Sequence, residues 1–115
     1  MHHNQKIGNL GQQIAVRFLN GKGFRIIDQN IYFRVGEIDI LAEKDNILSF
    51  IEVKTRTNLK FGFPEEGVTD TKRKHLELAI DCYMAENNVN QECVLEIIAI
   101  LLDLKNKKAY LKYFY

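Results

Sequence analysis

The stretch GEIDILAEKDNILSFIEVKTR, residues 36–56, decides the fold. Two segments that are predicted to be extended, 36–42 and 47–55, flank the polar tetrapeptide 43–46. Extended segments on either side of a short polar break are typical of a β-hairpin, here with a four-residue loop. The centre of the chain is therefore predicted to be a two-stranded ribbon.

The loop length sets the register of this ribbon. It places Ile40 opposite Ser49 and Ile38 opposite Ile51, and strand alternation then gives the ribbon two faces. One face is almost purely apolar and carries Ile38, Ile40, Ala42, Ile47, Ser49, Ile51 and Val53. The other face mixes apolar and charged side chains: Glu37, Asp39, Leu41, Leu48, Phe50, Glu52 and Lys54. We expect the apolar face to pack against the core. We expect the mixed face to be partly covered and to carry charge.

The segments on either side of the hairpin supply helices and further strands. Apolar residues at helical spacing predict helices over 6–20 and 71–86, the second capped by Thr69 or Thr71. Three more strands are predicted over 24–27, 94–102 and 109–115, the last at a sheet edge. Residues 28–30 are polar and are predicted to interrupt the first of these strands. The order predicts an α/β domain with a central mixed sheet flanked by helices.

Length and composition set the broad class. At 115 residues the chain has room for one domain, predicted to span residues 1–115, and 46% hydrophobic against 27% charged residues indicates a globular protein. The net charge of +1 is not that of a strongly basic nucleic-acid binder, although local charge matters more than the sum. No stretch approaches the ~18 apolar residues of a membrane span, and the two cysteines form no CxxC. We therefore expect a reduced, cytoplasmic protein that does not contact the membrane.

Three charged side chains share the mixed face of the predicted hairpin. In the predicted register Asp39 lies opposite Phe50, and Glu52 is its diagonal neighbour, with Cβ atoms roughly 7 Å apart. Lys54 follows one pleat further along the same face. Two carboxylates at this distance can bind Mg²⁺, which prefers oxygen ligands, and an ammonium group beside them can orient a water or stabilise charge on a phosphate. A solvated face with cross-strand salt bridges is the alternative interpretation.

Charge along the chain fits a phosphate-bearing partner. From Glu37 to Glu52 there are five acidic residues and one basic residue, whereas from Lys54 to His75 there are six basic and three acidic residues. The basic residues predicted to contact nucleic acid are Arg56, Lys72, Arg73 and Lys74. An acidic pocket bordered by a basic rim is what metal-dependent cleavage of a polyanion requires.

These residues resemble a known group of proteins. Asp39 with Glu52-Val53-Lys54 is similar to the PD-(D/E)XK nuclease superfamily. A longer set of motifs resembles the uncharacterised bacterial YraN-type family, which is related to Holliday junction resolvases. The matching motifs are Gly8-x-x-Gly11, Asn30, residues 36–40, residues 50–56, Phe61-Gly62, and Val68-Thr69 leading to Lys72. The resemblance covers residues 8 to 102.

The resemblance implies a fold, a reaction and a set of site residues. It implies a restriction endonuclease-like fold, an Mg²⁺-dependent endonuclease activity (with Mn²⁺ as a substitute) on DNA or structured nucleic acid, and a homodimer. Asp39 and Glu52 would be metal ligands together with the main-chain carbonyl of Val53, and Lys54 would be the catalytic lysine. Lys72 matches a lysine that opens the second helix.

The sequence also differs from the family pattern. The glutamate of the family's first helix is replaced by Gln12 or Gln13, and Gln12 fits the spacing better. We expect Gln12 and Glu37 to contact the metal ligands without binding the metal themselves. The family's arginine after Asn30 is replaced by Tyr32, and its late Arg-Phe-Asp by residues 94–96.

Because an amide brings no charge, a nucleic-acid-binding module that has lost turnover is a second hypothesis. A structural or partner-binding protein, favoured by the near-neutral net charge, is a third. These hypotheses differ in whether the protein cleaves nucleic acid, only binds it, or does neither.

Overall fold

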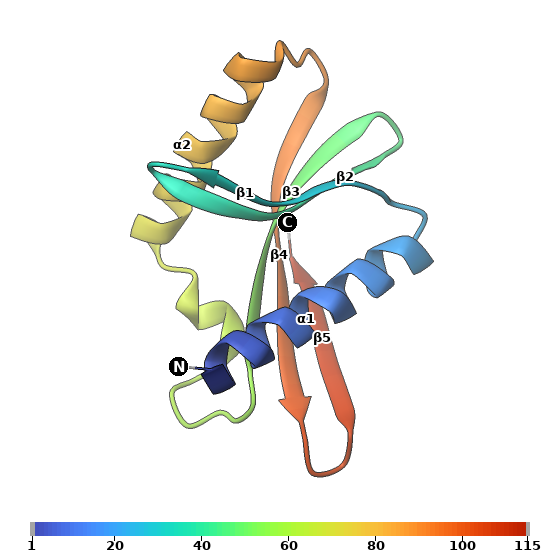
Figure 1. Ribbon diagram of the computed structural model, residues 1–115, viewed down its shortest axis with the longest axis vertical. Helices are drawn as coiled ribbons and strands as arrows, with labels where there is room; N and C mark the ends of the chain where they lie inside the picture. The colour runs from blue at the N-terminus through green and yellow to red at the C-terminus, as the bar shows by residue number, and fades with distance from the viewer. Residues whose placement is uncertain (1, 115) are drawn as a thin grey trace.

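The computed structural model describes residues 2–114, which form two α-helices, a short 3-10 helix and one five-stranded sheet. The elements are α1 (His2–Gly21), β1 (Arg25–Phe33), β2 (Gly36–Lys44), β3 (Ile47–Arg56), η1 (Pro64–Gly67), α2 (Asp70–Asn87), β4 (Glu92–Asp103) and β5 (Lys108–Phe114). The strand order in the sheet follows the chain, from β1 to β5 (Figure 1). β3 and β4 are parallel and joined through α2, and the other neighbours are antiparallel.

The predicted α/β class, with a mixed sheet between helices, is confirmed. The C-terminal strand lies at a sheet edge, as predicted, and its predicted last residue, Tyr115, lies outside the described residues. Thr69 caps α2 by accepting a hydrogen bond from the Lys72 amide at 3.2 Å. Neither α-helix of the described chain is long and apolar enough to span a membrane.

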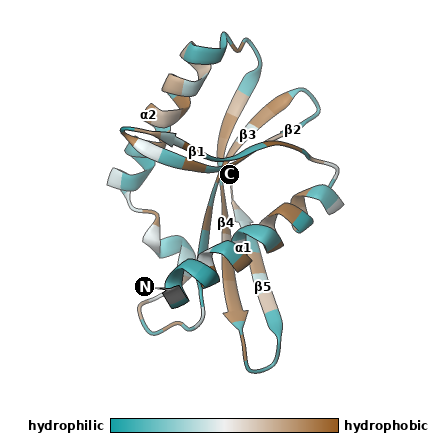
Figure 2. Ribbon diagram, in the orientation of Figure 1, coloured by the Kyte–Doolittle hydropathy of each residue, from teal (hydrophilic) through white to brown (hydrophobic). Residues whose placement is uncertain are grey.

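The two helices cover opposite faces of the sheet. Under α1, the buried side chains are Ala15, Leu19, Ile40, Ala42, Ile51, Ile98, Ile100 and Leu102. Under α2, they are Ile38, Leu41, Leu48, Phe50, Ala79 and Ile80. Figure 2 shows hydrophobic residues along β3 and β4, the strands with a neighbour on each side. Both faces of the central strands are therefore buried, and the mixed face predicted for the hairpin is covered by α2.

The predicted register of the hairpin is wrong by two residues. The loop contains only Asp45 and Asn46, so that Lys44 pairs with Ile47. Both loop residues have positive φ, 53° and 64°, which aspartate and asparagine tolerate better than most residues, and this turn matches the natural twist of two strands. Because the shift is even, Ile40 and Ile51 stay on the same face as each other.

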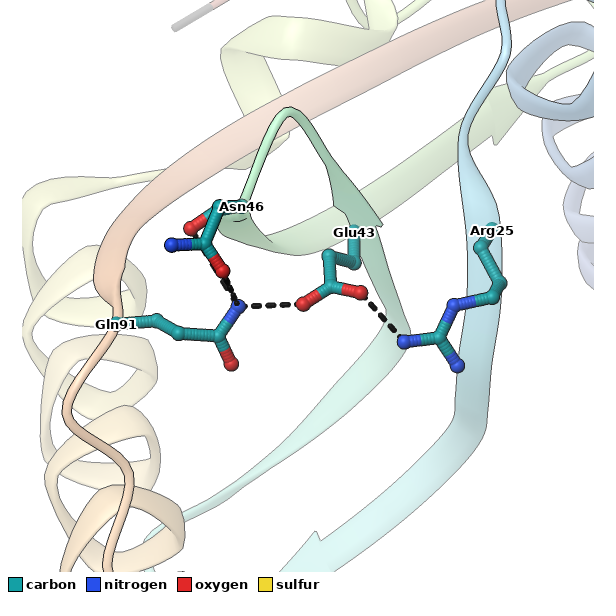
Figure 3. Close-up of polar contacts among 4 residues, drawn as sticks. All are labelled: Arg25, Glu43, Asn46 and Gln91. Carbon is teal, nitrogen blue, oxygen red and sulfur yellow. Dashed lines mark hydrogen bonds and ion pairs between the residues drawn. The ribbon is translucent and has the colours of Figure 1, made fainter.

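Side-chain contacts fix this tight turn (Figure 3). Glu43 forms an ion pair with Arg25 of β1 at 2.5 Å and accepts a hydrogen bond from Gln91, which precedes β4. The Gln91 amide also donates to Asn46 Oδ1 at 3.1 Å. Hydrogen bonds from Arg25 and Gln91 hold the pKa of Glu43 below its ordinary value. Three strands are thus tied together at one end of the sheet.

Two further predictions about the first strands need correction. β1 runs without a break from Arg25 to Phe33, because a register irregularity between Ile26 and Asp28 absorbs the polar segment that was expected to interrupt it. Ile38 packs with the cluster under α2 and not with Ile40, because the hairpin formed by β1 and β2 turns toward α2 (Figure 1).

The close approach of α1 to β3 depends on a glycine. A Cβ at Gly11 would overlap the Thr55 side chain, whereas a Cβ at Gly8 would meet nothing within 4 Å. We expect Gly11→Ala to destabilise the protein by about 1–3 kcal/mol, because the overlap outweighs the better helix propensity of alanine. The matched control Gly8→Ala should stabilise it by about 0.5–1 kcal/mol. Urea unfolding of both variants measures the difference; equal effects at the two positions would contradict this packing.

Candidate functional site

The candidate site lies where β2 and β3 separate. Their main-chain pairing ends at Ile40 and Ile51, and beyond it the hairpin of β1 and β2 turns toward α2 while β3 continues beside β4 (Figure 1). In the gap, Asp39 Oδ2 accepts a hydrogen bond from the Val53 amide at 2.8 Å. A carboxylate thus replaces the main-chain carbonyl that would otherwise satisfy this amide.

The structure brings Asp39 and Glu52 together. The observed register ends one position before these residues, and its continuation by one position would place them opposite each other and not diagonally. Glu52 is only 4% exposed, and its carboxyl group lies close enough to that of Asp39 to change the pKa of Asp39. Burial, followed by the hydrogen bond and the charge of Glu52, raises the pKa of Asp39 to about 9.

The pair has the properties of a cation site. Glu52 Oε2 is buried and accepts no hydrogen bond from the described residues, although the Lys72 ammonium group lies 3.3 Å away. The charge of Glu37 adds to the negative potential at Asp39. An unsatisfied buried carboxylate oxygen in such a place is well matched to a positive ion.

The possible ligand atoms of the acidic pair are oxygen atoms. No group of three or more His, Cys, Asp or Glu side chains that could hold a metal occurs in residues 2–114. A cation here would depend on two carboxylates, a main-chain oxygen and further oxygen ligands from water or substrate, which is the usual environment of Mg²⁺. In an extended strand the N–H and C=O of one residue point to the same neighbour, so the Val53 carbonyl shares the side of β3 on which its amide meets Asp39.

Lys54 and Arg56 follow on β3 and are both partly buried. A Cβ at Gly67 of η1 would lie 3.4 Å from Lys54 Cε and 3.3 Å from Arg56 Nη2, so η1 approaches both side chains. Arg56 Nη1 also donates to the main-chain carbonyl of Phe61 at 2.9 Å. The two basic side chains therefore both lie close to η1, and strand alternation places them on the same side of β3 as Glu52.

The three basic residues predicted at the start of α2 occupy different environments. Lys72 reaches the sheet and forms the ion pair with Glu52. Arg73 lies 3.9 Å from Glu77 one turn along the helix, and both side chains are largely exposed. Lys74 is exposed as well. Only Lys72 joins the acidic pair, and the other two lie on the outer surface of α2.

Gln12 lies behind the site. Its Nε2 donates to the main-chain carbonyl of Asp39 at 3.3 Å and to Gln29 Oε1 at 3.0 Å. The side chain thus holds the strand that carries Asp39. Sequence reasoning missed Gln29, because it lies in the polar segment that was expected to interrupt a strand. No pattern in the sequence indicates that Gln29 accepts a hydrogen bond from Gln12, which lies 17 residues before it.

Tyr32 and Glu96, which belong to the other two departures from the family pattern, lie away from the acidic pair. Tyr32 is 74% exposed near the turn between β1 and β2. Glu96 is only 4% exposed, but it lines an open cavity of about 450 Å³ under α1 together with Ser49 and Tyr113. Glu52, by contrast, lies on the α2 side next to Leu76. Glu96 therefore does not take part in the site.

The mixed five-stranded sheet with a helix on each face is compatible with the restriction endonuclease-like class of α/β proteins. Sequence comparison identifies the family: the family described as "Uncharacterised protein family UPF0102" matches residues 11–100, and the chain belongs to it. The predicted membership of the YraN-type family is thereby confirmed.

Relatives match over most of their length. A UPF0102 protein of Caldicellulosiruptor saccharolyticus is 35% identical over 107 residues, which cover 91% of this chain and 90% of the relative. One of Flavobacterium psychrophilum is 37% identical over 108 residues, covering 94% and 91%. One of Clostridioides difficile is 37% identical over 101 residues, covering 87% and 89%.

Proposed function

We propose that the protein is a metal-dependent endonuclease that hydrolyses phosphodiester bonds of DNA or structured nucleic acid. The observation that carries the proposal is the pair of carboxyl groups, Asp39 and Glu52, set in a gap between strands, with the Lys72 ammonium group 3.3 Å from Glu52 and Lys54 two residues further along β3. The homodimer and the cytoplasmic location stay predictions.

Each residue of the site has a role in this proposal. Asp39 and Glu52, with the Val53 carbonyl, would hold Mg²⁺ or Mn²⁺. The bound cation would supply Lewis acidity, polarising a phosphoryl oxygen and making a nearby water more acidic. Lys54 stabilises negative charge that develops on the phosphate, and Arg56 contacts the next phosphate along the strand. Lys72 neutralises Glu52 when no divalent ion is present.

Nuclease assays with Mg²⁺ or Mn²⁺ on single-stranded, duplex and branched DNA test the proposal. We expect Asp39→Asn, Glu52→Gln and Lys54→Met each to reduce cleavage at least ~100-fold. Asparagine is preferred to alanine at position 39, because its side-chain oxygen can still accept from the Val53 amide. Asp81→Asn, at an exposed position of α2, is the control and should leave activity unchanged. Full activity in Asp39→Asn or Glu52→Gln would remove this site as the source.

A nucleic-acid-binding module without turnover is the second candidate function. The observation in its favour is Gln12, whose amide nitrogen faces the Asp39 main chain where the family's acidic residue would stand. This candidate predicts salt-dependent DNA binding without cleavage, and tighter Mn²⁺ binding in Gln12→Glu. Calorimetric titration with Mn²⁺ distinguishes the binding module from the endonuclease. If the original chain and Gln12→Glu bind Mn²⁺ equally tightly, Gln12 does not weaken metal binding and the binding-module hypothesis loses its support.

A further inference from the structure

The loop between β3 and η1 presents an aromatic ring to solvent. Phe61 is 82% exposed, compared with 45% for Phe63, whose ring is covered by the Lys112 ammonium group at 4.8 Å. A phenylalanine side chain in water forgoes the favourable free energy that its burial would gain. A single exposed apolar residue is common, so the surroundings of Phe61 decide what it means.

The loop that carries Phe61 is fixed by hydrogen bonds. The Gly62 amide donates to the Leu59 carbonyl at 3.1 Å, and Arg56 donates to the carbonyl of Phe61 itself at 2.9 Å. Gly62 has a φ of +98°, a conformation that suits glycine and turns the chain directly after Phe61. The main chain that carries the exposed ring is therefore hydrogen-bonded to Arg56, two residues after Lys54 on β3.

A cavity lies beside the ring. It has a volume of about 470 Å³ and is lined by Phe61, Arg56, Thr55, Thr57 and Asn58, with Ile7 from the N-terminal part of α1. Figure 1 shows this loop beside the first turns of α1. Hydroxyl and amide groups, a guanidinium group and one aromatic face together match a nucleotide: a base with a flat π surface and hydrogen-bonding edges, joined to a phosphate.

The cavity shares Arg56 with the pair of basic side chains on β3. Lys54 and Arg56 are two residues apart on β3, about 7 Å along the strand, and a Cβ on Gly67 would lie within 3.4 Å of both side chains. A strand of nucleic acid whose phosphate lies at Lys54 can therefore continue past Arg56 toward Phe61. Bases inside a duplex are already stacked on both faces, so only an unpaired base can place its face on the ring.

We propose that Phe61 is a stacking platform for an unpaired nucleobase, with Arg56 on the adjacent phosphate, and that it gives the protein a preference for single-stranded segments over continuous duplex. This inference rests on the proposed function, because it assumes that nucleic acid is the substrate or ligand. Base–aromatic stacking contributes enough affinity per base for the loss of one ring to be measured directly.

Fluorescence anisotropy with labelled oligonucleotides tests the platform in the full chain, with EDTA present to prevent cleavage. We expect Phe61→Ala to weaken binding of a single-stranded oligonucleotide about tenfold or more, with less than a roughly twofold change for a duplex of the same length. Leu59→Ala, in the same loop and at a 46% exposed side chain, is the matched control and should bind as the original chain does.

A second variant detects the contact itself. The chain contains no tryptophan, so Phe61→Trp introduces a single indole at the platform. We expect its fluorescence to be quenched in a saturable manner by single-stranded but not by duplex oligonucleotide. Single-strand binding that is unchanged in Phe61→Ala, together with an unquenched indole, overturns the inference while leaving the proposed function intact.

Two other outcomes are also decisive. If the original chain binds no oligonucleotide at low salt, both the inference and the proposed function fail. If Phe61→Ala instead changes the sedimentation coefficient at micromolar concentration, the ring belongs to a contact between copies of the chain, and the stacking role is overturned.

Discussion

Asp39→Asn is expected to make the metal-free protein more stable above pH 7. The pKa of Asp39 is raised from 3.8 to about 9 by burial and by the neighbouring Glu52, so the folded state holds a proton that the unfolded chain releases. The stability linked to this proton is fully present below pH 4 and is lost as the pH rises toward 9. Over this range the free energy of unfolding should fall by up to about 1.4 kcal/mol per pH unit.

Asparagine removes this pH dependence, because it carries no charge at any pH and keeps the hydrogen bond from Val53. The measurement is thermal unfolding in EDTA between pH 5 and 9, for the original chain and the variant. The original chain should lose stability with rising pH and the variant should lose much less, with a Tm at pH 9 higher by about 4–8 °C per kcal/mol gained. Adding Mn²⁺ should raise the Tm of the original chain only. Parallel pH curves for the two proteins would contradict the raised pKa of Asp39.

Lys72→Met is expected to destabilise the metal-free protein by about 1–2 kcal/mol at pH 7. The ammonium group lies 3.3 Å from a buried oxygen of Glu52, and its removal leaves an uncompensated buried carboxylate. Methionine preserves most of the apolar stem, so packing changes little. The expected loss of stability is smaller than for a fully buried ion pair, because the lysine side chain is 41% exposed.

Arg73→Met is the matched control, one position further along the same helix. Its partner Glu77 is 3.9 Å away and 60% exposed, so the change should cost less than about 0.5 kcal/mol. Urea unfolding at pH 7 compares the two variants with and without Mg²⁺. A divalent ion at the acidic pair would replace the missing charge, so Mg²⁺ should reduce the defect of Lys72→Met and leave Arg73→Met unchanged. Equal losses in both variants would show that the lysine adds nothing beyond a surface ion pair.

The sequence predicted the fold well because its apolar patterns are strong. The helical stripes and the isoleucine-rich hairpin identified the element order and the mixed sheet. The register of the hairpin was missed because residues 43–46 are all polar, and composition alone does not reveal that Glu43 and Lys44 extend a strand while Asp45 and Asn46 form the turn. That distinction depends on φ values and on a contact from Gln91, distant in the sequence.

The sequence singled out Asp39, Glu52 and Lys54 as candidate site residues, but it did not indicate how they are arranged. Alternation along β3 placed Glu52 and Lys54 on one face, and the motif pointed to Asp39. The separation of β2 from β3, which lets a side-chain carboxylate take the Val53 amide, has no signal in the sequence. The same holds for the reach of Lys72 to Glu52 and of Gln12 to the Asp39 main chain, since both depend on how the helices dock on the sheet.

The single parallel pairing, between β3 and β4, bears on the order in which the molecule assembles. Antiparallel neighbours join through short turns and cost little chain entropy to close, whereas residues 57–91 must be ordered before β4 can align with β3. The meander of β1, β2 and β3 is therefore expected to form early. The packing of α2 and β4 against it is expected to form late. Asp39 and Glu52 both belong to the early part, so two like charges come together before the lysine that offsets them has arrived.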